Sequence, residues 1–318
     1  MSLKEQLRAK YRDKETYDKL DGKFIELRIQ QFRLETLPDT LTERDLVELE
    51  KLRQNSPVVP LGELFSKLEK HEDAPKKVLI RGRPGVGKTT LVEYLAREWA
   101  IGNLWPEIDY VFVLKLRKLL ETANWSLSDL LFGDLELSDL DKTAALDELC
   151  QHSGHVLCIV DGLDEHQLYE FSQCRFPVGE KVTLGKMISS IISRSLLPKA
   201  KVILTTRPTH RIPPFKEFGR VVDIYGFTVD GIKHYVEKFC AGKEELKRYI
   251  WKNIDSNPNM ATFCHTPILC LFICEALEDI HEHPESSSDL EMKTMTQMYV
   301  KATYRLAKKL HPSLKFAK

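Results

Sequence analysis

The chain lacks an excess of either charge and lacks any long apolar run. Its 318 residues carry 47 basic and 47 acidic side chains, so no overall field favours DNA, RNA or an anionic membrane. No apolar stretch approaches the roughly 20 residues that span a membrane. The first residues, MSLKEQLRAKYRDKE, are charged where a secretory signal needs an apolar core. We therefore expect a cytoplasmic protein that binds neither nucleic acid nor a membrane.

The seven cysteines lack the spacing of a zinc site. Cys270 and Cys274 lie four residues apart on an apolar helical pattern, and Cys158 lies within an apolar run. We interpret the cysteines as reduced residues of the core, which fits an intracellular protein.

A complete phosphate-binding loop is present. The segment from Gly82 to Thr89 reads GRPGVGKT and lies between an apolar run, residues 78–80, and a helical pattern that opens at Lys88. In this setting backbone N–H groups and a helix N-terminus face a polyphosphate. Lys88 is expected to pair with the β- and γ-phosphates and Thr89 to bind Mg²⁺. The expected nucleotide-contacting residues are Gly82, Arg83, Pro84, Gly85, Val86, Gly87, Lys88, Thr89 and Thr90.

A second motif follows the apolar run at residues 156–160, which has the length of a strand buried in a parallel sheet. It ends in Asp161-Gly162-Leu163-Asp164-Glu165. A carboxylate at this position lies beside the phosphate loop, so Asp161 is expected to hold Mg²⁺. Glu165 is the candidate base that orients the attacking water, and Asp164 competes with it for that role.

The next apolar strand, residues 202–204, leads to an arginine. Arg207 stands at the carboxyl edge of the predicted sheet, where a guanidinium can contact the third phosphate and so distinguish triphosphate from diphosphate. Strands alternate with helices up to residue 226, which predicts an α/β fold with a parallel sheet flanked by helices. Helical patterns then continue to residue 310 and predict a small all-α domain.

Together these segments resemble the NACHT region of NOD-like receptors, which belong to the STAND class of P-loop switches. The resemblance rests on the phosphate loop, the DGLDE and LTTRP motifs, the Gly226-Phe227-Thr228 run before a helix, and CHTPILC at residues 264–270. It implies that Pro267 packs on the adenine of ATP or ADP. It also implies a switch with slow hydrolysis that is closed with ADP, self-associates through the nucleotide-binding domain with ATP, and meets unknown protein signalling partners.

We expect four segments. They are a charged helical segment at 1–54, the nucleotide-binding domain at 55–226, a small helical domain at 227–282, and the start of a winged helix or a tail at 283–318. The body of the winged helix is missing relative to the family pattern. Three other functions share the phosphate loop: a housekeeping ATPase with steady turnover, a small-molecule kinase, and an interaction scaffold with an inert nucleotide.

Overall fold

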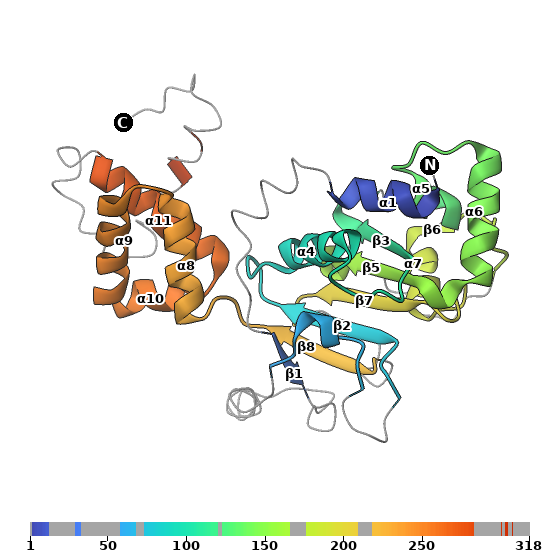
Figure 1. Cartoon of the computed structure of the whole chain (residues 1–318), viewed down its shortest axis with the longest axis horizontal. Coiled ribbons are helices and arrows are strands. Elements are labelled where there is room, and N and C mark those ends of the chain that lie inside the picture. Colours follow the sequence, from blue (N-terminus) through green and yellow to red (C-terminus); the bar gives the residue numbers. More distant parts are fainter. Residues whose placement is uncertain are drawn as a thin grey trace. The chain divides into compact units, whose positions relative to one another are not determined.

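The structure is a computed structural model. It describes residues 2–12, 29–32, 58–67, 73–119, 123–165, 176–208 and 218–282, with single helical positions at 300, 303, 304 and 307. The described residues form two compact units. The first comprises the described residues up to Pro84 and those from Lys88 to Ile224, and the second comprises Gly85–Gly87 and the described residues from Tyr225 on. Figure 1 labels the elements of both.

The first unit is built on a six-stranded sheet with the order β1-β8-β2-β7-β5-β3. Five strands run parallel, and the sixth, β1, pairs antiparallel with β8 at one edge. The strand bounds are Ile29–Phe32 for β1, Lys77–Gly82 for β2, Tyr110–Lys115 for β3, Val156–Asp161 for β5, Lys201–Thr206 for β7 and Arg220–Ile224 for β8. The predicted parallel sheet is thus confirmed.

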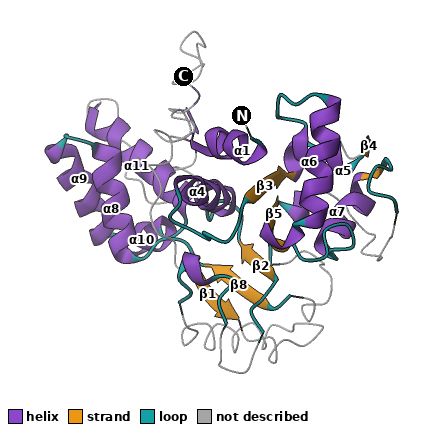
Figure 2. Ribbon diagram, turned by 45° about the vertical axis from the view of Figure 1, so that its right-hand side comes forward, coloured by secondary structure: helices purple, strands orange, loops and turns teal. Residues whose placement is uncertain are grey.

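Helices cover both faces of this sheet. In Figure 2 the strands β2, β3 and β5 lie between α4 on one side and α6 and α7 on the other. The helices of the unit are α1 at Leu3–Arg12, α4 at Lys88–Ile101, α5 at Leu127–Phe132, α6 at Asp139–Gln151 and α7 at Leu184–Ile192. A short antiparallel pair, β4 at Asn124–Trp125 and β6 at Val182–Thr183, forms a second sheet. Single 3-10 turns are η2 at Leu61–Glu63, η3 at Leu116–Lys118, η4 at Ser153–His155 and η5 at Leu163–Glu165.

The core lies between the sheet and these helices. All six residues of β5 are buried, as its unbroken apolar run predicts for a strand covered on both faces. Burial also raises the pKa of the Cys158 thiol in this strand to about 12, so the thiol stays protonated and packs as a small apolar group. The six described cysteines are free.

The amino-terminal segment, predicted as a charged helical segment at 1–54, contains a strand as well as a helix. Helix α1 ends at Arg12, and residues 29–32 are the edge strand β1. The reason is the free edge of β8, which offers unpaired backbone groups to any segment that reaches it, and periodicity within the segment does not reveal that partner. Both α1 and β1 belong to the first unit.

Helix α1 packs on α4 and on the opposite edge of the sheet, formed by β3. Leu7 is buried, the Tyr11 ring meets Trp99 edge-on at 6.3 Å, and the Tyr11 hydroxyl accepts the backbone N–H of Val113 at 3.1 Å. The Arg12 Nε donates to the Ala100 carbonyl in the last turn of α4, where a cation is favourable.

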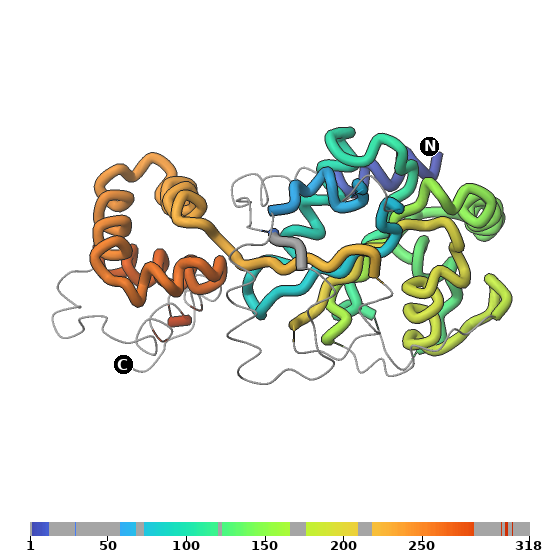
Figure 3. Tube along the Cα trace, turned by 90° about the horizontal axis from the view of Figure 1, so that it is seen from below, coloured from blue at the N-terminus to red at the C-terminus, as the bar shows by residue number. Residues whose placement is uncertain are grey.

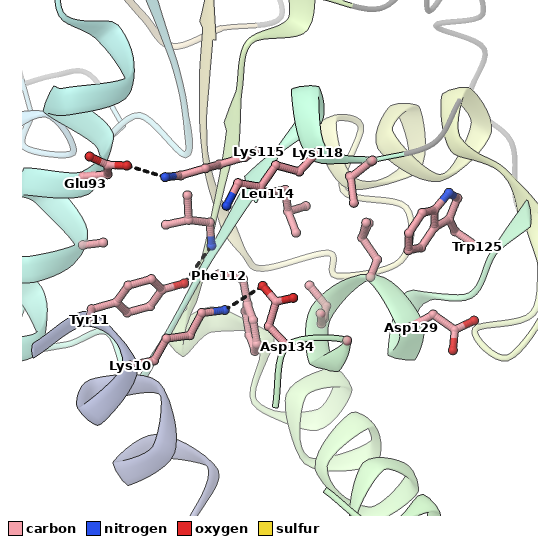
Figure 4. A pocket seen from close by; sticks show the side chains of 16 residues that line it. Lys10, Tyr11, Glu93, Phe112, Leu114, Lys115, Lys118, Trp125, Asp129 and Asp134 are labelled. Atoms are coloured by element: carbon pink, nitrogen blue, oxygen red, sulfur yellow. Dashed lines mark hydrogen bonds and ion pairs between the residues drawn. The ribbon is translucent and has the colours of Figure 1, made fainter. Parts of the chain in front are cut away.

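A cavity of about 460 Å³ lies at this edge (Figure 4). Its walls come from α1, α4, α5 and β3, and two ion pairs, Lys10 with Asp134 and Lys115 with Glu93, join these elements. None of the nucleotide-contacting residues that the sequence predicts lines this cavity.

The second unit contains four helices, α8 at Val229–Cys240, α9 at Glu244–Ser256, α10 at Pro258–Cys264 and α11 at Pro267–Glu282. Figure 3 follows β8 as it continues into α8. Thr228 caps α8, because its hydroxyl accepts the N–H of Gly231. Gly226 has a φ of 96°, and a Cβ there would lie 2.0 Å from the His265 carbonyl oxygen, so only glycine fits this turn. Among the described helices, none is long and apolar enough to cross a membrane.

Candidate nucleotide-binding site

The phosphate loop lies between β2 and α4, as its sequence setting predicts. Gly82 is the last residue of β2, and Lys88 is the first of α4. Gly85 and Gly87 have φ values of 73° and 102°. A residue with a Cβ adopts such positive φ values only with steric strain. The loop therefore turns into the N-terminus of a 14-residue helix, where unpaired backbone N–H groups favour an anion.

The Lys88 ammonium points back at this loop. Its Nζ donates to the carbonyl of Gly82 at 2.7 Å and to that of Arg83 at 3.2 Å. Burial lowers the pKa of Lys88, while the nearby carboxylate of Asp164 opposes that shift. Among the described residues, the hydrogen-bond partners of this cation are the neutral carbonyls of Gly82 and Arg83, and a polyphosphate would supply the charges that they lack.

The second motif meets the first at Asp161. This carboxylate is 6% exposed. Its Oδ2 accepts the hydroxyl of Thr89 at 2.8 Å, and its Oδ1 accepts the hydroxyl of Thr205 at 2.6 Å. The structure therefore brings together the two residues that the sequence assigned to Mg²⁺, although they lie 72 positions apart.

These donors suit the metal. A threonine hydroxyl and a carboxylate are the hard oxygen ligands that Mg²⁺ prefers, and Mg²⁺ at phosphate sites is commonly held by one or two protein oxygens together with the substrate. Thr89 and Asp161 would hold the ion, which would neutralise charge on the phosphates.

Arg207 and Asp164 form a contact that the sequence did not predict. The Arg207 Nε lies 2.6 Å from Asp164 Oδ2, and the backbone N–H of Arg207 donates to Asp164 Oδ1 at 3.1 Å. Half of the arginine side chain is exposed, whereas the Asp164 side chain is only 7% exposed. Both carboxylate oxygens of Asp164 therefore contact Arg207, and the role of Asp164 as a base stays a prediction.

Glu165 is exposed on the turn that follows β5. Its backbone N–H donates to the carbonyl of Gly162, which has a φ of 85°. In the described part of the chain, its carboxylate forms no hydrogen bond or ion pair. Its role as a base stays a prediction, as does the exchange of that role with Asp164.

Thr205 and Pro267 lie on different elements. Thr205, which the sequence reasoning did not single out, holds Asp161 and also accepts the N–H of Gly162 at 2.9 Å. Its position at the end of β7, the strand that pairs with β5, is the sequence feature that could have indicated this role. Pro267 begins α11 in the second unit, and its contact with an adenine stays a prediction.

The parallel sheet, the phosphate loop and the acidic strand end define a P-loop nucleotide-binding protein. The family model of the NACHT domain matches residues 76–243, more than half of the chain, so the chain belongs to the NACHT family. The predicted resemblance to NOD-like receptors is confirmed.

Similar curated proteins carry the same domain in their names. Human NACHT, LRR and PYD domains-containing protein 3 is 28% identical over 268 residues, which are 81% of this chain and 25% of that protein. Human NACHT, LRR and PYD domains-containing protein 12 is 28% identical over 236 residues, 71% of this chain and 21% of that protein. The chain spans about a quarter of the length of these relatives. A solved structure of a RuvB variant from Thermotoga maritima overlaps 72% of this chain and 61% of that chain, with a TM-score of 0.36 and 15% identity.

Proposed function

We propose that the chain is the nucleotide-driven part of a signalling switch that rests with ADP, self-associates with ATP and resets by slow hydrolysis. The observation that carries the proposal is the bond between Thr89 and Asp161, which joins the phosphate loop to the acidic strand end. Innate-immune signalling is the context that the relatives' family supports. Cytoplasmic location is part of the proposal, and the free described cysteines support it.

Lys88 is the residue that would bind the phosphates of the nucleotide. Its ammonium exchanges the carbonyls of Gly82 and Arg83 for charged phosphate oxygens, and a charge-assisted hydrogen bond contributes about 1.5–3 kcal/mol. Lys88→Ala should therefore weaken binding of ATP and ADP by at least about tenfold.

Arg207 is the residue that would distinguish ATP from ADP. In the structure Asp164 holds its guanidinium, and the third phosphate of ATP would compete with that carboxylate. ADP lacks the competing group. A ligand shifts a conformational equilibrium only through such a difference in interaction between two states. Arg207 and Asp164 thus form the element that would distinguish the two nucleotides.

The test has three parts: the nucleotide in the purified protein, its turnover rate, and the sedimentation profile with Mg-ADP and with a slowly hydrolysed ATP analogue. We expect bound adenine nucleotide, turnover far below ~10 s⁻¹, the median of enzymes, and larger assemblies only with the ATP analogue. Lys186→Ala, at an exposed lysine of α7, is the control for Lys88→Ala.

Other results of these measurements would indicate a different function. Steady turnover near the enzyme median would indicate a housekeeping ATPase. An unchanged sedimentation profile with every nucleotide would indicate a scaffold. Arg207→Ala should lower affinity for ATP more than for ADP, and equal losses in calorimetry would remove Arg207 from the switch.

A further inference from the structure

A buried ion pair lies directly below the phosphate loop. Arg81 Nε bonds to Asp223 Oδ1 at 2.7 Å and Nη2 bonds to Oδ2 at 2.8 Å. Only 4% and 8% of the two side chains are exposed. Arg81 immediately precedes Gly82, the first residue of the loop, and Asp223 is the penultimate residue of β8. The pair has no part in the phosphate and Mg²⁺ binding that is assigned to Lys88, Asp161 and Arg207.

The pair lies on the opposite face of the sheet from the Mg²⁺ residues. Arg81 is level with Thr206 of β7 on one side and with Asp223 of β8 on the other. Thr205, the neighbour of Thr206, bonds to Asp161. Since successive side chains of a strand point to opposite faces, the Arg81 guanidinium points away from the Thr205–Asp161 contact. Any influence on bound nucleotide must therefore pass through the backbone.

The backbone at this point is part of the site. The carbonyl of Gly82, the residue after Arg81, is the nearer acceptor of the Lys88 ammonium. Gly82 is also level with Ile224, the last residue of β8. A planar guanidinium that holds both oxygens of a carboxylate fixes direction as well as distance. The end of β2 is thereby held in one position against β8.

We propose that Arg81 and Asp223 are a positioning pair that presets the phosphate loop, and Lys88 with it, for nucleotide. The pair also links the loop to β8, the strand from which the chain continues into the helical unit at Tyr225. Nucleotide that orders the loop should therefore also protect the backbone amides of β8. This inference rests on nucleotide binding at the phosphate loop.

A purely structural role makes a different prediction. Removing one partner of a buried pair leaves an uncompensated charge and destabilises strongly, whereas replacing both partners by apolar residues of similar volume is often neutral. The double variant Arg81→Met/Asp223→Leu separates the two roles. If the pair only stabilises, the double variant recovers both stability and affinity. If the pair positions the loop, it recovers stability alone.

The experiment measures thermal unfolding and Mg-ADP affinity by calorimetry, using the full 318-residue chain. We expect Arg81→Met alone to be destabilised. The double variant should unfold within about 3 °C of the wild type and bind Mg-ADP at least about tenfold more weakly. Arg81→Lys keeps the charge but replaces the planar fork by a single ammonium. It should show the same loss of affinity, and it decides the question even if the double variant does not fold.

The control is Lys201→Met/Glu107→Leu, at a more exposed ion pair whose side chains are 19% and 52% exposed. This ion pair, at 2.5 Å, lies at the amino end of β7, away from the loop, and its removal should leave Mg-ADP affinity unchanged. Hydrogen exchange gives an independent measurement. Mg-ADP should slow exchange at residues 221–224 in the wild type and much less in the double variant.

Two failures are distinguishable. If the wild type binds no nucleotide, nucleotide binding itself fails. If the wild type binds Mg-ADP and either Arg81→Lys or the folded double variant binds it equally well, the positioning role is wrong and the pair is structural.

Discussion

Removing the Thr205 hydroxyl should cost more than removing that of its neighbour Thr206. Both threonines are fully buried at the end of β7. The Thr205 hydroxyl donates to Asp161 at 2.6 Å and accepts the Gly162 amide at 2.9 Å, whereas the Thr206 hydroxyl has no hydrogen-bond partner in the described part of the chain. Valine has nearly the same shape as threonine, so Thr205→Val and Thr206→Val isolate the hydroxyl.

The magnitude follows from the two bonds. A hydrogen bond to a charged group contributes about 1.5–3 kcal/mol and one between neutral groups about 0.5–1.5 kcal/mol. Thr205→Val should therefore lose about 2–4 kcal/mol of unfolding free energy, which corresponds to a fall in Tm of roughly 4–16 °C for a domain of this size. Thr206→Val buries an apolar group in place of an unpaired polar one and should be neutral or slightly stabilising.

The assay is thermal unfolding by calorimetry, with and without Mg-ADP. Because Thr205 fixes one oxygen of Asp161, its valine variant should also show a weaker dependence of nucleotide affinity on Mg²⁺. Equal Tm changes in the two variants would refute the reasoning, since the variants differ in hydrogen bonding but not in burial.

Four further changes test other parts of the structure. Glu165→Gln should keep Mg-ATP bound and slow hydrolysis by roughly 10²–10⁴. Asp164→Asn should chiefly change the preference between ATP and ADP. If Asp164→Asn stops hydrolysis and Glu165→Gln does not, Asp164 is the base. Because burial lowers the pKa of Lys88 and the protonated form binds phosphate, nucleotide affinity should be full at neutral pH and should fall as the pH rises, starting below the usual lysine value of about 10.4. Constant affinity up to that pH in calorimetry would contradict this. Tyr11→Phe removes the acceptor of the Val113 amide, so hydrogen exchange of that amide should accelerate, and unchanged exchange would show that the contact is absent in solution.

Local motifs were the part of this protein that sequence could predict. The phosphate loop needs glycines at fixed offsets, and the apolar runs of β2, β3, β5, β7 and β8 have the length and composition of buried parallel strands. Asp161 could be assigned because any residue at the carboxyl end of such a strand lies near the loop. These inferences depend on local patterns and on the rule that the carboxyl ends of parallel strands meet at one edge of the sheet.

Contacts between distant segments that no motif encodes could not be predicted. The antiparallel pairing of β1 depends on the free edge of β8, about 190 residues further along the chain. The contact between Asp164 and Arg207 depends on how a short 3-10 turn directs one carboxylate. Thr205 and Thr206 are identical in sequence terms, and only the strand register decides which one meets Asp161.

The strand β1 also has a practical consequence for anyone who shortens this chain. The family match begins at residue 76, but β1 lies well before it and covers the outer edge of β8. A recombinant domain that starts at residue 76 would leave the unpaired backbone groups of β8 open to another molecule, which is a known route to aggregation. It would also lack α1, which covers Trp99 and the end of α4. For biochemical work the useful amino-terminal boundary is therefore set by α1 and β1 together, and the protein should be produced with both.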